Sequence, residues 1–119
     1  TFEYVNAGHN PPLLIRDGKI IKLEIGGMIL GVMKTILPYR SEKIQLMKDD
    51  VLVMFTDGIS EAMNKKSEEF SDKALEKLSL EMASASAETI LKEIQSEVQR
   101  FTDGANQSDD ITLVVIKVK

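Results

Sequence analysis

Short apolar runs separated by turn residues dominate the sequence, a pattern typical of β-strands in a globular protein. Phe2 and Tyr4 share one face of the first run, and the run at 51–55 is apolar at every position. A strand that is apolar at every position, such as the run at 51–55, is expected to be covered on both faces. The predicted strands lie at residues 1–7, 13–15, 19–23, 39–47, 51–55 and about 111–118.

Two amphipathic helices are predicted between the last two strands. Ser71 and Ser86 can each cap a helix N-terminus, and apolar residues follow both at helical spacing. Asp17-Gly18 is a strong signal for a two-residue hairpin turn, and the glycine-containing stretch at 26–38 is expected to be a loop. The stripes expected to face the core are Leu75, Leu78 and Met82, then Ile90, Leu91, Ile94, Val98 and Phe101.

The order of elements is a block of strands, then two helices, then a final strand, which predicts an α+β fold rather than a βαβ alternation. Strands buried on both faces and amphipathic helices together predict layers, with sheet packed on sheet or on helix and the helices outside. A chain of 119 residues is enough for one domain. The six methionines are expected to fill gaps in its core.

Composition excludes several classes of function. The net charge is −4 and no long basic run occurs, so nucleic acid is not an expected partner. No apolar stretch approaches the ~20 residues of a membrane helix, and no signal peptide opens the chain. The absence of cysteine excludes disulfides, thiolate catalysis and Cys-ligated zinc, and fits the cytoplasmic location that we expect.

Two aspartates lie next to the ends of buried-looking strands, one just after a strand and one just before another, which suggests a shared site. Asp57 comes directly after the 51–55 run, and Asp109 comes shortly before the last strand. If those strands are antiparallel neighbours, both carboxylates reach the same edge of the sheet. Carboxylates beside a glycine turn suit a hard cation such as Mg²⁺ or Mn²⁺, although Asp57-Gly58 alone could also be an ordinary turn.

Four motifs with distinctive residues stand along the chain: Asn6-Ala7-Gly8-His9-Asn10-Pro11-Pro12, Leu30-Gly31-Val32, Phe55-Thr56-Asp57-Gly58 with Glu61-Ala62, and Asp109-Asp110-Ile111-Thr112. In this order they resemble the SpoIIE/RsbU-like phosphatases, the bacterial branch of the metal-dependent (PPM-type) protein Ser/Thr phosphatases. The resemblance covers essentially the whole chain. Four signatures in order are more specific than Thr-Asp-Gly alone.

The resemblance implies a layered α-β-β-α sandwich that hydrolyses phosphoserine or phosphothreonine in proteins. The implied substrates are small anti-anti-sigma-type regulators, and a sensory or receiver domain is expected upstream in the parent chain. Asp57 and Asp109 match the family's metal-binding carboxylates. The resemblance also implies that the complete domain would hold two divalent cations, Mn²⁺ or Mg²⁺, which would supply an activated water for attack on phosphorus.

One family motif is missing. The opening metal motif, an Asp-x-Ser-Gly-His-Gly type segment that bears the bridging aspartate, does not occur in this sequence. We therefore expect residues 1–119 to be the C-terminal portion of a single phosphatase domain, incomplete on its N-terminal side. Without that carboxylate, the fragment alone is predicted to hold metal weakly and to be inactive. Exposed sheet edges would favour a homo-oligomer.

Five further residues are candidates for an outer shell or for the loops around the metal. Glu61 could bind metal through water or be an ordinary acid of a helix N-terminus. Asp110 could orient its loop, cap an N–H group or bind the metal directly, although adjacent residues of a strand point to opposite faces and the resemblance favours Asp109. His9 and Asn10 could stabilise their own turn or lie near the phosphate site, and Gly58 shapes the turn.

A second hypothesis is a non-catalytic docking module in sigma-factor control. The two candidate ligands favour the enzyme, because docking alone does not require them.

Overall fold

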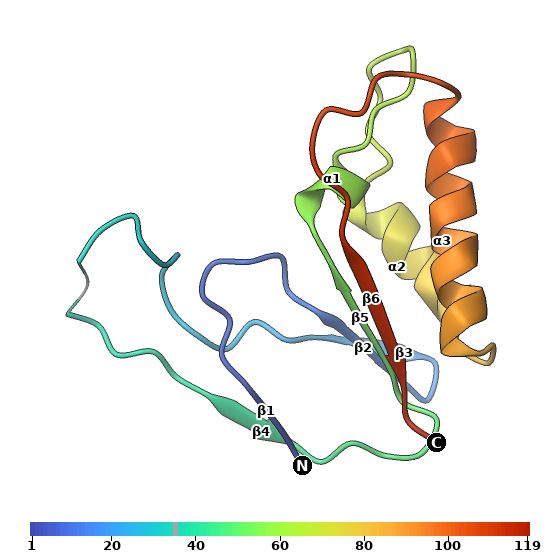
Figure 1. Ribbon diagram of the computed structural model, residues 1–119. Helices are drawn as coiled ribbons and strands as arrows, with labels where there is room; N and C mark the ends of the chain where they lie inside the picture. Colours follow the sequence, from blue (N-terminus) through green and yellow to red (C-terminus); the bar gives the residue numbers. More distant parts are fainter. Residues whose placement is uncertain (35) are drawn as a thin grey trace.

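The computed structural model describes residues 1–34 and 36–119. Figure 1 shows the helices gathered on one side of the strands, while a long loop between the third and fourth strands extends away from them. The elements are β1 (Phe2–Tyr4), β2 (Leu13–Arg16), β3 (Lys19–Lys22), β4 (Glu42–Ile44), β5 (Val51–Phe55), α1 (Asp57–Ser60), α2 (Asp72–Glu81), α3 (Ala87–Thr102) and β6 (Leu113–Lys117).

Four strands form one antiparallel sheet in the order β3-β2-β5-β6. The hairpin predicted between β2 and β3 is confirmed, because Asp17 and Gly18 both have positive φ, 49° and 70°, as a type I′ turn requires. The sequence-distant strands β5 and β6 are direct neighbours, and Phe55 pairs with Leu113 at one end of their ladder. This pairing confirms the antiparallel arrangement on which the proposed aspartate site depends.

The remaining strands, β1 and β4, form a separate two-stranded antiparallel sheet. Both are shorter than the runs predicted at 1–7 and 39–47, because only three residue pairs are in register. Phe2, Tyr4 and Ile44 from this small sheet pack against the larger one. The predicted layering of sheet on sheet is therefore confirmed.

Strand β5 separates two apolar clusters, which confirms that both of its faces are covered. Val51, Val53 and Phe55 belong to the cluster on the helix side, and Leu52 belongs to the cluster on the side of the small sheet. The helix-side cluster also contains the buried residues Leu13, Ile15, Ile59, Ala62, Phe70, Leu75, Ile90, Ile94 and Val98. The alternation of a strand thus places successive residues of β5 in different layers.

Serine caps open the two longer helices as predicted. Ser71 accepts a hydrogen bond from the amide of Ala74, and Ser86 accepts one from the amide of Thr89. Each cap satisfies one N–H group that the first helical turn leaves without a partner. In the described part of the chain, every helix is too short or too polar to cross a membrane.

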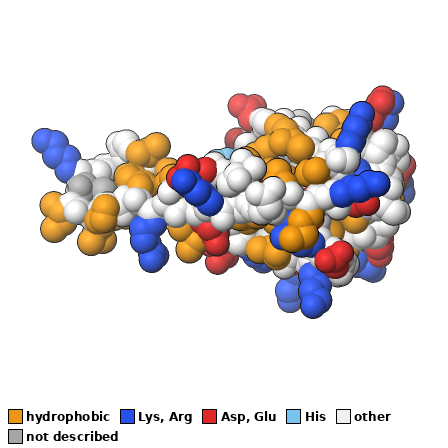
Figure 2. Space-filling model, turned by 90° about the horizontal axis from the view of Figure 1, so that it is seen from below, with side chains coloured by type: hydrophobic (Ala, Val, Ile, Leu, Met, Phe, Trp, Pro, Cys, Tyr) orange, Lys and Arg blue, Asp and Glu red, His pale blue; other side chains and the backbone are white. Residues whose placement is uncertain are grey.

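The loop that joins β3 to β4 carries many exposed apolar side chains. They are Met28, Ile29, Leu30, Val32, Met33, Ile36 and Leu37, which are 40 to 101% exposed. Figure 2 shows apolar side chains along this narrow end of the molecule. The prediction that all six methionines fill the core is therefore wrong. Met54 and Met82 pack against the clusters, whereas Met28, Met33, Met47 and Met63 are exposed.

Candidate metal centre

The two candidate ligands lie just beyond one end of the β5–β6 ladder. Phe55 pairs with Leu113, so β5 leaves the sheet where β6 enters it. Asp57 opens the short helix α1 two residues after β5, and Asp109 lies in the exposed loop before β6. The fold thus brings both aspartates to one edge of the sheet, as the sequence predicted.

Gly58 marks the point where these two segments touch. It is buried in α1, and a Cβ atom added to it would overlap the carbonyl oxygen of Asp110 and come within 3.3 Å of that of Asp109. No residue with a side chain fits there unless the backbone moves. The requirement for glycine therefore comes from close approach of two backbones and not from an unusual φ angle.

Asp57 lines a cleft of about 430 Å³ together with two of the predicted outer residues, Asn10 and Glu61. The cleft is strongly polar, and it also includes Ser60, Glu69, Ser71, Asp72 and Lys73. The amide of Ser71 donates a 2.7 Å hydrogen bond to the carbonyl of Ser60, which joins the start of α2 to the end of α1. The cleft itself gathers Asn10, Asp57 and Glu61 from two distant parts of the sequence.

Asp109 is held by its own loop and does not line that cleft. Its Oδ1 accepts a 2.7 Å hydrogen bond from the amide of Asp110, and its carbonyl accepts one of 2.8 Å from Gln107 Nε2. The other carboxylate oxygen, Oδ2, has no hydrogen-bond partner among the described residues. One oxygen of Asp109 is therefore available to a ligand while the other orients the loop.

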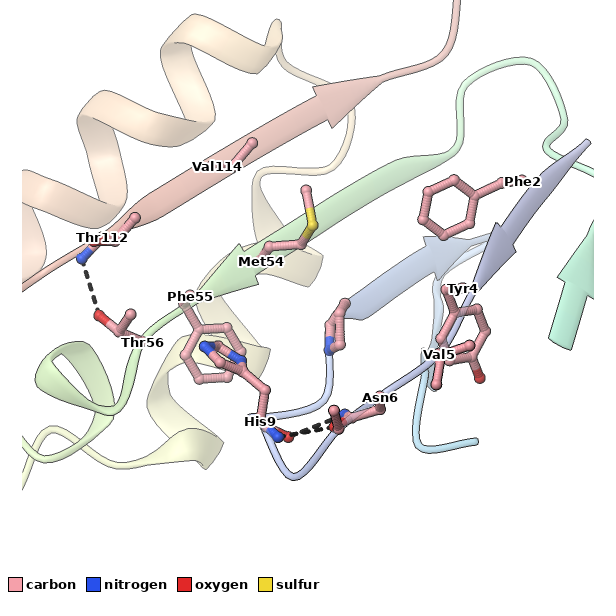
Figure 3. A pocket seen from close by; sticks show the side chains of 12 residues that line it. Phe2, Tyr4, Val5, Asn6, His9, Met54, Phe55, Thr56, Thr112 and Val114 are labelled. Atoms are coloured by element: carbon pink, nitrogen blue, oxygen red, sulfur yellow. Dashed lines mark hydrogen bonds between the residues drawn. The ribbon is translucent and has the colours of Figure 1, made fainter. Parts of the chain in front are cut away.

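His9 stabilises its own turn, one of the two roles that the sequence left open. Its amide donates to Asn6 Oδ1 at 2.8 Å, Asn6 Nδ2 donates back to the His9 carbonyl at 3.0 Å, and the ring Nδ1 lies 3.1 Å from the carbonyl oxygen of Asn10. Figure 3 shows Asn6 and His9 in contact beside an apolar cavity of about 380 Å³. Asn6 therefore closes the turn that carries His9, a role that was not predicted from the sequence although asparagine is typical of such side-chain-closed turns.

The residues present fit a hydrated hard cation better than a closed metal cage. The described residues contain no group of three or more His, Cys, Asp or Glu side chains placed to hold a metal ion. Mg²⁺ commonly keeps several waters and binds to one or two carboxylates, which is what Asp57 and Asp109 can supply. A structural zinc site, by contrast, needs four ligands rich in His and Cys.

An aspartate at the other end of β5 has a different environment. Asp50 is only 2% exposed and accepts hydrogen bonds from Arg16 at 2.9 and 2.5 Å and from the amide of Met47 at 2.8 Å. The hydrogen bonds from Arg16 hold the pKa of Asp50 below its usual value, against the opposing effect of burial. Asp50 is thus fully engaged in the structure and is no ligand.

Comparisons with known proteins show the family and the fold that the chain matches. Residues 1–119 match the model of the family described as Stage II sporulation protein E (SpoIIE). The chain is similar to the phosphoserine phosphatase RsbU of Bacillus subtilis (strain 168), with 31% identity over 121 residues. That alignment covers 99% of this chain and 35% of RsbU, so the chain spans about a third of this relative.

Two solved structures show the same fold. The phosphatase domain of the cell fate determinant SpoIIE from Bacillus subtilis, in an Mn-presoaked form, has a TM-score of 0.67 at 24% identity, covering 98% of this chain and 50% of that one. The SiaA-PP2C domain of Pseudomonas aeruginosa has a TM-score of 0.83 at 16% identity, covering 98% and 46%. The layered arrangement is therefore that of PP2C-type phosphatase domains.

Proposed function

The chain belongs to the SpoIIE family, and on that premise we propose that it supplies the Asp57–Asp109 part of a metal-dependent protein phosphatase site. The reaction class is hydrolysis of phosphoserine or phosphothreonine in a protein. The observation that carries this proposal is the meeting of the two aspartate-bearing segments at Gly58, beyond the paired ends of β5 and β6. The Mn-presoaked form of a structural relative supports Mn²⁺ as the cation.

The residues of the chain divide the work between binding and orientation. Asp57 and the free oxygen of Asp109 would hold a divalent cation, while Asp110 and Gln107 fix the loop that carries Asp109. Such ions lower the pKa of bound water and offset charge on phosphoryl oxygens, which is the chemistry they supply to phosphate hydrolysis. Asn10 and Glu61 face the same cleft as Asp57 and would contact the ion through water.

The whole protein is proposed to act in the cytoplasm on an anti-anti-sigma-type regulator, with two divalent cations in the complete domain. Among the residues that the structure describes, no three or more His, Cys, Asp or Glu side chains are grouped so as to hold a metal ion. Residues 1–119 alone are therefore expected to bind Mn²⁺ weakly and to turn over slowly. Domain organisation beyond these residues, including a sensory or receiver domain and assembly through sheet edges, is part of the same proposal.

A non-catalytic docking module is the second candidate. It is favoured by the absence of a three-carboxylate cluster in the described part of the chain and by the apolar side chains of the β3–β4 loop, which Figure 2 shows at the narrow end. A docking module would present this apolar surface to a protein regulator. It would not require a cation at Asp57.

A paramagnetic titration distinguishes the two functions. Mn²⁺ added to the ¹⁵N-labelled chain should broaden the amide signals of Gly58 and Asp110 first, and Asp57→Asn should abolish this effect. Asp103→Asn is the matched control, because that side chain is 85% exposed and lies in the same loop as Asp109. A phosphoserine peptide should then bind to the chain only when Mn²⁺ is present. The unphosphorylated form of the same peptide should not bind under either condition.

Broadening that persists in Asp57→Asn, or that spreads evenly over the surface, would contradict the phosphatase site. That result would move the assignment to the docking module.

A further inference from the structure

The ladder between β5 and β6 continues past its last residue pair through a side chain. Beyond Phe55 and Leu113, the amide of Thr56 donates to the carbonyl of Thr112 at 3.1 Å. The Thr56 hydroxyl then donates to the carbonyl of Asp110 at 2.9 Å and accepts from the amide of Thr112 at 2.9 Å. Figure 3 shows this last bond at the rim of the cavity.

The position of Thr56 makes this use of its hydroxyl unusual. Thr56 is the N-cap residue of α1, where a threonine side chain commonly accepts a hydrogen bond from the helix, yet here it makes no such bond. The hydroxyl is instead directed across to residues 110–112 and acts as donor and acceptor at once. Serine and threonine can do both, whereas valine, which has the same shape, can do neither.

The hydrogen bond from the Thr56 hydroxyl to the Asp110 carbonyl joins the sequence neighbours of the two candidate ligands. Thr56 directly precedes Asp57, and its hydroxyl holds the carbonyl of Asp110, the residue after Asp109. The same carbonyl lies against Gly58, so it is fixed by a hydrogen bond on one side and by close packing on the other. A shift of the 109–112 segment would therefore change the separation of the two carboxylates directly.

We propose that Thr56 is the positioning residue of the metal centre, and that its hydroxyl sets the placement of Asp109 relative to Asp57. This inference rests on the proposed function, because it takes the two aspartates as ligands of one cation. Thr56 itself binds neither metal nor phosphate in this scheme. It acts by joining the end of β5 to the loop that enters β6.

Two substitutions separate the hydroxyl from the shape of the side chain. Thr56→Val keeps the β-branched shape and removes both hydrogen bonds, whereas Thr56→Ser keeps the hydroxyl and removes only a methyl group. In Thr56→Val, hydrogen exchange of the Thr112 amide should accelerate about tenfold, and Mn²⁺ affinity, read from the broadening of Gly58, should fall about tenfold. Thr56→Ser should leave both near the wild-type values.

The outcomes distinguish this inference from the function on which it rests. If Thr56 has only a structural role, Thr56→Val should unfold at a lower urea concentration while the folded chain keeps its Mn²⁺ affinity. That result would overturn the positioning role alone. Equal losses in Thr56→Ser and Thr56→Val would also overturn it, because the hydroxyl would then not matter. A wild-type chain that binds no Mn²⁺ at this edge overturns the metal centre and the inference together.

Discussion

The two ends of strand β5 each carry an aspartate, and the fold uses them in opposite ways. Asp50 is buried and bound to Arg16 and to a backbone amide, whereas Asp57 is exposed at the opening of a polar cleft. The Asp50 end is further fixed by Lys117 of β6, whose Nζ donates to the carbonyls of Ala83 and Ala85. One end of the β5–β6 pair is thus tied by charged groups and the other by neutral hydrogen bonds.

This difference explains which of the two carboxylates can act as a metal ligand. A buried carboxylate whose oxygens are already satisfied stabilises the fold and has no capacity left for a cation. An exposed carboxylate beside a tight backbone contact keeps its oxygens available while its position stays defined. The comparison therefore predicts that substitutions at the Asp50 end change stability, and that substitutions at the Asp57 end change metal binding.

The largest effect is expected at Gly58. In Gly58→Ala the new methyl group would overlap the Asp110 carbonyl, so the loop must move away. We expect a loss of about 2–3 kcal/mol in urea unfolding, the usual cost of overpacking, and loss of Mn²⁺ binding with it. Gly104→Ala is the control, because Gly104 has a positive φ of 79° but open space around it. A smaller effect at Gly58 than at Gly104 would contradict the close contact.

The next effect is a change of stability at the other end of β5. Asp50→Asn should lower the free energy of unfolding by about 2 kcal/mol at neutral pH, because it removes the charge from a buried partner of Arg16. Mn²⁺ binding should not change. Asp49→Asn is the matched control, because Asp49 is the adjacent aspartate in the sequence and is exposed. A loss of Mn²⁺ binding in Asp50→Asn with unchanged stability would reverse the comparison.

The pH dependence of stability follows from the same ion pair. The Arg16 hydrogen bonds lower the pKa of Asp50 in the folded state, so the stabilisation is fully present above the unfolded pKa of about 3.9. It is lost as the pH falls through the lower folded pKa. The stability difference between wild type and Asp50→Asn, measured by urea unfolding, should therefore shrink below about pH 4. A constant difference down to pH 2 would contradict this assignment.

The smallest effect is expected in the loop before β6. Gln107→Ala removes an exposed hydrogen bond to the Asp109 carbonyl, so Mn²⁺ affinity should fall by no more than about fivefold. Asn106→Ala is the neighbouring control. An effect of Gln107→Ala as large as that of Thr56→Val would show that the loop is positioned from within and not by β5.

The sequence predicted those features that depend on local pattern. The apolar run at 51–55, the Asp17-Gly18 turn and the serine caps at 71 and 86 all have the expected structures. The meeting of the Asp57 and Asp109 segments was also predicted, because antiparallel pairing of two apolar strands determines which ends coincide. These features need only short-range propensity or the order of strands.

The features that were missed depend on contacts between distant residues. Nothing in the local sequence distinguishes Asp50, which binds Arg16 34 residues away, from its exposed neighbour Asp49. Thr56 reaches residues more than 50 positions along the chain, and Met28 and Met33 are exposed although methionine is usually buried. Such partners are defined by tertiary packing, which periodicity does not reveal.

A double-mutant cycle on Mn²⁺ binding tests the central claim most directly. If Asp57 and Asp109 hold the same cation, either single change to asparagine should remove most of the affinity, and the double variant should lose little more. Urea unfolding of each variant controls for folding. If the two losses of binding free energy simply add, the affinity of the double variant falls by the product of the two single factors. That result would show two independent sites and contradict the shared metal centre.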